Sequence, residues 1–129
     1  MLVLIRGAGD IATGIALRLH RAGLRVVMTD LPAPTAIRRT VCFSPAILHG
    51  ETEVEGVRAL RADSPEQALS LLAQGVVPVL PDPDCLCREQ LHPDALVDAI
   101  LAKKNLGTRI TDAPVVVGIG PGFTAGEDC

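Results

Sequence analysis

The chain has 129 residues, of which 48% are apolar and only 2% aromatic, and its formal net charge is −3 at pH 7. This length predicts a single domain over residues 1–129 with an aliphatic core. The few aromatic residues and the absence of a basic run disfavour nucleic-acid binding, and no apolar stretch approaches the ~20 residues of a membrane span. The opening MLVLI is too short for the apolar part of a signal peptide, so we expect a cytoplasmic protein without a membrane segment.

The first thirty residues predict a strand, a turn, a helix and a second strand. Residues 2–5 form a continuous apolar run, which is typical of a buried parallel strand. Apolar and small residues then recur at helical spacing over residues 10–22, and Gly23 follows where a glycine commonly ends a helix. Residues 25–29 predict the second strand, which Asp30 closes.

Later segments continue the alternation of strands and helices. Prolines break residues 31–51 into loop and short pieces, and residues 54–60 predict a strand. Ser64, Pro65 and Glu66 have the chemistry of a helix start, and Gly75 predicts the end of that helix. Three more strands are expected, at residues 76–80 (where Pro78 suits an edge strand or a strand end better than the centre), 95–101 (a strand, or a strand turning into a short helix) and 115–119, with a loop at 81–87.

This alternation predicts an α/β fold. We expect a Rossmann-like, mostly parallel sheet with helices on both faces and right-handed crossovers. Ligands of such sheets bind beyond the carboxyl ends of the strands. The turn after the first strand lies at that edge.

The first turn carries the variant dinucleotide-binding motif G-x-G-x-x-A, formed by Gly7, Gly9 and Ala12. Gly7 permits the tight turn, Gly9 lets a pyrophosphate approach the backbone, and Ala12 lets the helix pack closely on the strand. Free N–H groups at the helix start then face the phosphate. Asp30 stands where an acid would bind a ribose hydroxyl. The alternative is that the glycines only form a tight turn.

Charged residues near this turn modify the prediction. Asp10 puts a carboxylate beside the expected phosphate, unless it caps the helix and points away. Arg38 and Arg39 follow the second strand and favour a phosphorylated ligand, such as one with a 2′-phosphate, over plain NAD.

A second glycine turn follows the last predicted strand, with Gly120 and Gly122 on either side of Pro121. No lysine follows, so this is not a P-loop. If the first and last strands are parallel in one sheet, both turns emerge at the same edge, and the second could cover a ligand held by the first. The alternative is that the second turn only ends the sheet.

Three long motifs resemble those of one family. They are IRGAGDIATGIA, P-T-x-I-R-R-x-V-x-F from Pro34 to Phe43, and DAILAKKNLGTRITDAPVVVGIGPGFTAG from Asp98 to Gly126. Together they are similar to the YqeB-type family of selenium-dependent molybdenum hydroxylase system proteins. The resemblance covers nearly the whole chain. Similar proteins continue beyond the position of Cys129, so we expect a match to their N-terminal portion.

This resemblance implies an accessory role in the maturation of molybdenum hydroxylases that carry labile selenium. Such an enzyme, or its maturation factors, would be the partner, and the ligand would be a phosphate-bearing small molecule: NAD(P), another nucleotide or a molybdopterin compound. The resemblance supplies no catalytic residues. One alternative is a small NAD(P)-dependent oxidoreductase, which would need a residue that relays a proton, and the chain has no tyrosine for that role. The other alternative is a non-catalytic partner-binding domain. Assembly into a homo-oligomer stays open.

The remaining polar residues give weaker indications. The spacing of the four cysteines matches no zinc pattern, so no metal site is predicted. Cys85 and Cys87 form C-x-C in a proline loop, where we expect surface cysteines; a persulfide or selenide carrier would need an exposed thiol of low pKa there. Asp98 is expected to be buried beside Lys103 or Lys104, or to cap the turn after a strand.

Overall fold

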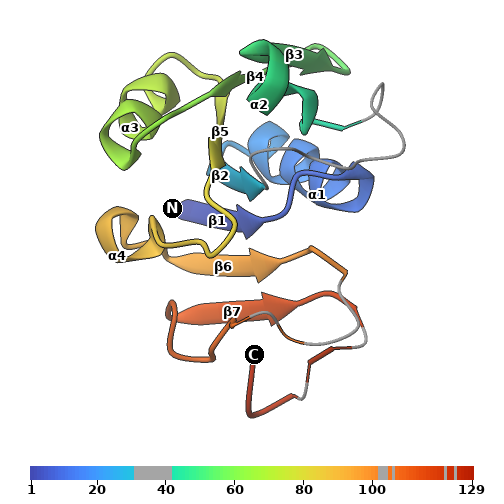
Figure 1. Cartoon of the computed structure of the whole chain (residues 1–129), viewed down its shortest axis with the longest axis vertical. Coiled ribbons are helices and arrows are strands. Elements are labelled where there is room, and N and C mark those ends of the chain that lie inside the picture. The colour runs from blue at the N-terminus through green and yellow to red at the C-terminus, as the bar shows by residue number, and fades with distance from the viewer. Residues whose placement is uncertain (31–41, 102–104, 106, 121, 124) are drawn as a thin grey trace.

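The computed structural model describes residues 1–30, 42–101, 105, 107–120, 122–123 and 125–129. Strands and short helices alternate along the chain (Figure 1). In chain order they are β1 (Leu2–Arg6), α1 (Asp10–Arg21), β2 (Arg25–Asp30), α2 (Pro45–His49), β3 (Glu51–Val54), β4 (Val57–Arg61), α3 (Pro65–Leu72), β5 (Val77–Pro81), α4 (Arg88–Leu91), β6 (Ala95–Asp98) and β7 (Val115–Gly118).

The seven described strands form one sheet in the order β3-β4-β5-β2-β1-β6-β7. All neighbours are parallel except β3 and β4, which form an antiparallel hairpin. The strand order changes direction at β1. The chain passes from β1 through α1 to β2 on one side, whereas β6 pairs with β1 on the other side. The carboxyl ends of β2, β1, β6 and β7 therefore lie along one edge of the sheet.

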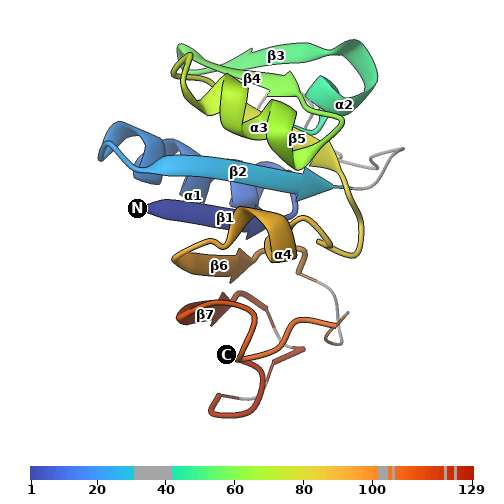
Figure 2. The ribbon, with the colours of Figure 1, turned by 90° about the vertical axis from the view of Figure 1, so that its left-hand side faces the viewer.

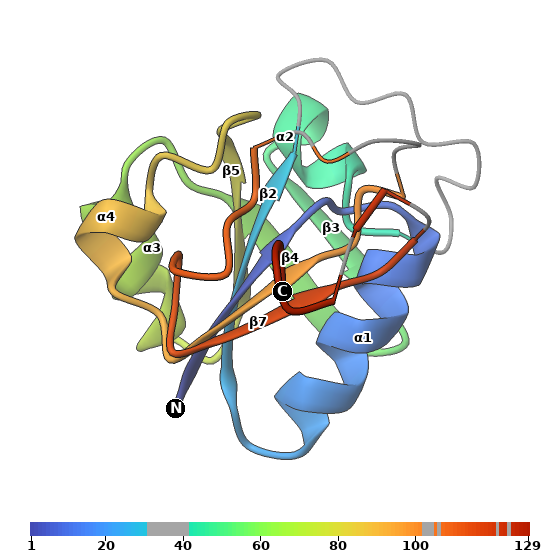
Figure 3. The same cartoon turned by 90° about the horizontal axis from the view of Figure 1, so that it is seen from below.

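Helices cover both faces of this sheet. Figure 2 shows α3 and α4 in front of the strands, and Figure 3 shows α1 on the opposite side. The sheet side chains form two corresponding apolar clusters: Val3 and Ile5 join the cluster that contains α1 and α2, whereas Leu2 and Leu4 join the one that contains α3 and α4. The α/β class and the mostly parallel sheet are thus confirmed.

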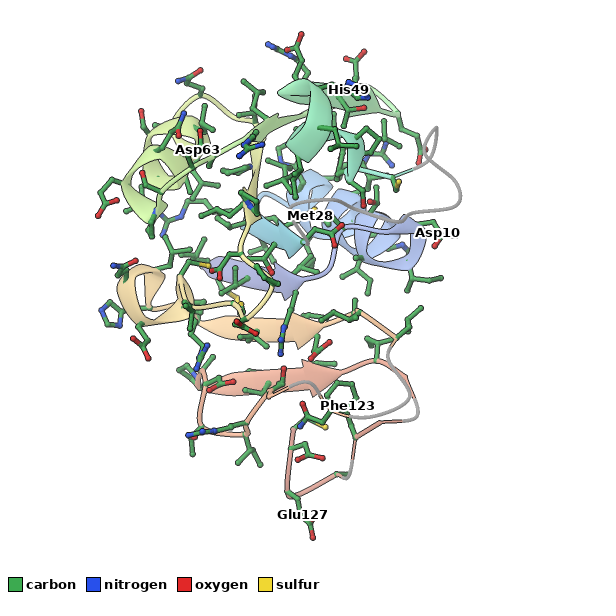
Figure 4. The ribbon with its side chains drawn as sticks, viewed as in Figure 1. Asp10, Met28, His49, Asp63, Phe123 and Glu127 are labelled. Atoms are coloured by element: carbon green, nitrogen blue, oxygen red, sulfur yellow. The ribbon has the colours of Figure 1, made fainter. Side chains whose placement is uncertain are left out.

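Close packing of α1 depends on small residues. Ala12 and Ala16 of this helix are fully buried, which lets its backbone approach β1 and β2. Met28 lies at the centre of the molecule among the core side chains (Figure 4). Within the described ranges, no helix has the length and apolar character needed to cross a bilayer.

The helix termini follow the sequence signals. Gly23 has φ of +87° directly after the Ala22 C-cap of α1. The Ser64 side chain accepts a hydrogen bond from the amide of Gln67 at the start of α3, and Pro65 occupies the first helical position. These residues confirm the predicted end of the first helix and the predicted start of the second.

One prediction about the elements was wrong. Residues 54–60 do not form one strand: Glu55 and Gly56, with φ of +51° and +81°, make a tight turn between β3 and β4. Pro78 lies near the start of β5, which matches the predicted strand end, although β5 is not an edge strand because it lies between β4 and β2. Pairing with β2 begins only at Val79, so the missing N–H of Pro78 does not interrupt that ladder. The sequence did not predict α2 and α4, two helices of only five and four residues.

Candidate functional site

The turn between β1 and α1 has the conformation that Gly7 makes accessible. Gly7 has φ of +112°, and its N–H donates a 2.7 Å hydrogen bond to the carbonyl oxygen of Thr29 at the end of β2. A Cβ atom at Gly7 would lie 3.1 Å from the carbonyl oxygen of Ala99. The backbone of the turn therefore requires a glycine at this position.

Gly9 is not required in the same way. It is the N-cap of α1, with φ of −73° and ψ of −167°, an extended conformation that any residue adopts. A Cβ atom built at Gly9 would meet no atom of the described residues within 4 Å. No described residue fills the space beside Gly9, so its lack of a side chain leaves the backbone of the turn accessible on that side.

The amides at the start of α1 are mostly without partners within the described part of the chain. The helix begins with the hydrogen bond from the Thr13 amide to the Gly9 carbonyl oxygen. Among described residues, no acceptor is found for the amides of Gly9, Asp10 and Ala12. Such amides carry the positive end of the helix dipole and are the usual partners of a bound anion.

A cavity of about 290 Å³ opens in front of this turn, close to the lower end of the ~300–1,000 Å³ typical of small-molecule sites. It lies at the carboxyl ends of β1, β2 and β6, where the strand order reverses and ligands of parallel sheets usually bind. Arg6, Thr29 and Asp30 contribute polar groups. Three half-exposed or exposed apolar side chains also line it: Ile11, Ile100 and Leu101.

Asp30 lies at the end of β2, as the sequence predicted, and it is half-buried in this cavity. One of its carboxylate oxygens accepts a hydrogen bond of 2.7 Å from the Ser44 hydroxyl. The amide of Ser44 donates in turn to the Ala8 carbonyl oxygen at 3.0 Å. Ser44, which the sequence analysis did not single out, therefore links the carboxylate of Asp30 to the turn.

Asp10 is exposed at the first position of α1 (Figure 4). Its carboxylate oxygen accepts a 3.0 Å hydrogen bond from the amide of Ile11, whereas the N-cap is Gly9. One of the amides at the start of α1 is therefore already bound to a carboxylate. Arg38 and Arg39 fall in residues 31–41, which lie outside the described residues.

Arg6 is the polar residue of this site that the sequence analysis missed. Its guanidinium is buried at the end of β1 and donates hydrogen bonds to the Pro83 carbonyl oxygen at 2.9 Å and to the Thr108 hydroxyl at 3.2 Å. The carboxylate of Asp98 lies 3.9 Å from the same guanidinium. The sequence could have indicated Arg6, because it is a charged residue at the end of a continuous apolar strand and such a charge needs a partner.

Asp98 has partners other than the predicted lysines. It accepts hydrogen bonds from the Thr108 hydroxyl at 2.5 Å and from the Ile100 amide at 3.2 Å. The bond to Ile100 confirms the predicted cap on the turn after a strand, and the charge is balanced by Arg6. Lys103 and Lys104 lie outside the described residues.

The second glycine turn emerges at the same edge of the sheet as the first, because β1 and β7 are parallel and separated only by β6. Gly120 has φ of +120°, and a Cβ atom there would lie 3.3 Å from the Cα of Leu101. Neither Gly120 nor Gly122 is among the described residues that line the cavity. Leu101 lies between this turn and the cavity. Figure 4 shows Phe123 beside β7, where its ring covers Gly118.

The C-x-C cysteines are not surface residues, contrary to expectation. Cys85 and Cys87 are 2% and 3% exposed, because they join the apolar cluster beneath α3 and α4. Asp82 holds their loop, since its carboxylate accepts hydrogen bonds from the amides of Leu86 and Cys87. Within the described ranges, no three His, Cys, Asp or Glu side chains are grouped as a metal site.

These observations define an α/β domain with a candidate ligand site at the carboxyl edge of a parallel sheet. Over 128 residues, which is 99% of the chain, it is 55% identical to a protein of Escherichia coli (strain K12) described as "Uncharacterized protein YqeB". This identity supports the YqeB-type family that the motifs indicated. The chain spans 24% of the length of that relative. No family model and no solved structure matches the chain.

Proposed function

We propose that this chain binds a phosphate-bearing small molecule at the turn formed by Gly7, Gly9 and Ala12. The observation that carries the proposal is Gly9. Its backbone conformation suits any residue, and no described residue fills the space where a side chain would lie, so the described part of the fold does not explain why a glycine stands there. Close approach of a ligand to the backbone does explain it.

The neighbouring groups match the parts of a nucleotide-like ligand. The amides of Gly9, Asp10 and Ala12 would donate to the phosphate oxygens at the start of a helix long enough to carry a dipole. Asp30 would accept from a ribose hydroxyl beyond the end of β2. The apolar side chains of Ile11 and Ile100 would contact a planar ring. NAD(P), another nucleotide and a molybdopterin compound all combine a phosphate with such a ring.

We infer that this fold is Rossmann-like and binds its ligand as Rossmann folds do. The motif lies in a strand–turn–helix–strand unit, at the point where the strand order reverses. The wider process is the one implied by the family. The chain would serve as a cytoplasmic accessory protein in the maturation of selenium-dependent molybdenum hydroxylases, with the hydroxylase or its maturation factors as partners. The 55% identity to the E. coli YqeB protein supports the family part of this proposal.

The oxidoreductase alternative is favoured by one feature, the carboxylate of Asp30 at the end of β2. An enzyme of that kind would bind NAD or NADP and oxidise or reduce a second substrate. An accessory protein would bind its ligand without turnover. Binding and turnover measured on the same preparation therefore separate the two functions.

Calorimetric titration of the purified chain with NAD, NADP, ATP and inorganic pyrophosphate tests the site. Gly9→Val should weaken binding at least tenfold, from the loss of about 1.5 kcal/mol of charge-assisted hydrogen bonding. Gly14→Val is the matched control, because a Cβ atom there also meets nothing within 4 Å and Gly14 lies outside the cavity. Equal effects of the two substitutions, or no binding of any of the four compounds, would contradict the proposal.

A further inference from the structure

The carbonyl group of Ala8, in the middle of the first glycine turn, is held by two other residues. Its oxygen accepts a hydrogen bond of 3.0 Å from the Ser44 amide and one of 3.4 Å from the Thr13 hydroxyl. Ala8, Thr13 and Ser44 are all buried. These bonds therefore fix the orientation of the peptide unit that joins Ala8 to Gly9.

This orientation determines where the Gly9 amide points. The described peptide bonds are all trans, and the C=O and N–H of a trans peptide point in opposite directions. Because the Ala8 carbonyl points toward Ser44 and Thr13, the Gly9 N–H points away from both. Gly9 lines the cavity, and its amide has no acceptor among the described residues. A donor that is fixed in this way needs no reorientation when an anion binds.

The Thr13 hydroxyl also anchors the segment that leads into α2. It accepts a 2.9 Å hydrogen bond from the amide of Phe43, whose side chain is fully buried in the core. The one proton of the Thr13 hydroxyl is then left for the Ala8 carbonyl oxygen. Thr13 therefore joins the residues before α2 to the glycine turn.

The Ser44 hydroxyl acts on a different group from the Ser44 amide. Its oxygen lies 2.7 Å from the Ala8 carbonyl oxygen and 2.7 Å from a carboxylate oxygen of Asp30. A serine hydroxyl has only one proton to donate. The carboxylate is the stronger acceptor, and the Ala8 oxygen already accepts from the Ser44 amide. The proton therefore belongs to the bond with Asp30.

The start of α2 does not explain this hydroxyl. Ser44 is the N-cap of α2, a position where a serine side chain usually accepts a hydrogen bond from an amide of the helix. The Ser44 side chain makes no such bond. Its hydroxyl instead contacts Asp30 at the wall of the cavity, which both residues line.

We propose that Thr13 and Ser44 are positioning residues for two different parts of one ligand. The Thr13 hydroxyl holds the peptide unit that presents the Gly9 amide to a phosphate. The Ser44 hydroxyl holds the Asp30 carboxylate, which accepts a hydrogen bond from a ribose hydroxyl. The ligand class is then a nucleotide with a free ribose hydroxyl, and this inference rests on the phosphate site proposed above.

The test compares ADP with 2′,3′-dideoxy-ADP, which has the same phosphates and base but lacks both ribose hydroxyls. Calorimetric titration of the full chain with each nucleotide and with inorganic pyrophosphate gives three dissociation constants for every variant. In the unaltered chain, ADP should bind about tenfold more tightly than dideoxy-ADP, because a hydrogen bond to a charged group is made only by ADP.

Ser44→Ala should change only the part of binding that depends on the ribose hydroxyls. The ratio of the two nucleotide dissociation constants should fall from about ten to about two, because the Asp30 carboxylate is no longer held. The affinity for pyrophosphate should stay within about twofold, since the amide of residue 44 still binds the Ala8 carbonyl. In an Asp30→Asn chain, Ser44→Ala should have no further effect on the ratio.

Thr13→Val should give the opposite pattern. All three ligands should bind about fivefold more weakly, because the Ala8–Gly9 peptide loses one of the groups that hold it. The ratio of the two nucleotide dissociation constants should stay at its value in the unaltered chain. Thr13→Ser keeps the hydroxyl and should restore the affinity for pyrophosphate.

Two results would overturn the inference. One is a ratio near one in the unaltered chain, and the other is a Ser44→Ala variant, shown to be folded by circular dichroism, that weakens all three ligands by the same factor. If Thr13→Val does not fold, the ratio in Ser44→Ala decides alone. Saturable binding of pyrophosphate in either case would leave the phosphate site standing, whereas no binding of any of the three ligands would remove both proposals.

Discussion

Gly7 and Gly9 stand two positions apart in the same motif, yet the structure makes different demands on them. Gly7 has a positive φ and lies against the backbone of Ala99. Gly9 has an ordinary backbone and an open side. The sequence motif predicts that both are glycines without saying which serves the turn and which serves a ligand. That separation needs the backbone angles and the position of the segment after β6.

Alanine at these two positions should therefore have different effects on stability. Gly7→Ala should lower the free energy of unfolding by roughly 1–3 kcal/mol, because alanine is strained at this φ and its Cβ crowds the Ala99 carbonyl oxygen. Gly9→Ala should change it by less than about 0.5 kcal/mol. Urea denaturation measures both values. Equal losses would show that Gly9 is a structural glycine as well.

Asp10 opposes the binding of an anion at the same turn. Its carboxylate occupies the Ile11 amide and adds a negative charge to the start of α1. Asp10→Asn should tighten the binding of pyrophosphate roughly fivefold, from about 1 kcal/mol of repulsion removed. Glu66→Gln, an exposed acid in the first turn of α3, is the control for net charge. A similar gain in both variants, or a loss in Asp10→Asn, would argue against an anion at the turn.

At the scale of the elements, the sequence predicted those helices and strands whose signals lie within a few neighbouring residues. The unit β1–α1–β2 and the start of α3 follow from apolar spacing, a glycine after the helix and a capping serine within a few residues of one another. The β3–β4 hairpin was missed because its turn has only two residues, Glu55 and Gly56, within an apolar pattern that reads as one strand. Gly56 could have indicated this turn, because glycine is common in tight hairpin turns. Strand order, which fixes where the cavity lies, depends on contacts distant in sequence.

The capping of α3 is a test of these local signals. The Ser64 hydroxyl accepts from the Gln67 amide at 3.1 Å, and the Gln67 side chain accepts from the Asp63 amide at 2.8 Å. Ser64→Ala should lower the free energy of unfolding by about 1 kcal/mol. Ser70→Ala, at an exposed position inside the same helix, should be neutral or slightly stabilising. Thermal and urea unfolding of both variants would check this, and an unchanged Ser64→Ala protein would contradict it.

At the scale of the whole molecule, the buried pair of Arg6 and Asp98 joins parts of the chain that are far apart in sequence. Arg6 contacts the loop after β5 through Pro83, while Asp98 and Thr108 connect β6 to the segment before β7. The sequence predicted that Asp98 is buried beside Lys103 or Lys104 or caps the turn after a strand. It did not indicate Arg6, because residues 6 and 98 are brought together only by the pairing of β1 with β6.

Removing one member of this pair should be costly. Asp98→Ala leaves the Arg6 guanidinium buried without a carboxylate and should lower the free energy of unfolding by about 3–5 kcal/mol. The double variant Arg6→Met with Asp98→Leu should recover most of that loss, since no unpaired charge remains. Urea denaturation of the single and double variants measures both. If Asp98→Ala lowered the free energy of unfolding by less than about 1 kcal/mol, the Arg6 guanidinium would have to be in contact with water, which would contradict this account.

The central claim, a phosphate site at the start of α1, is tested most directly by amide chemical shifts. The ¹⁵N-labelled chain would be titrated with pyrophosphate and then with NADP while ¹H–¹⁵N spectra are recorded. The account predicts saturable shifts of the Gly9, Asp10 and Ala12 amides, with smaller shifts at Asp30 and Ile100, and none at the exposed Gly14. Saturable binding with shifts elsewhere, or no shift of the three turn amides at any ligand concentration, would contradict it.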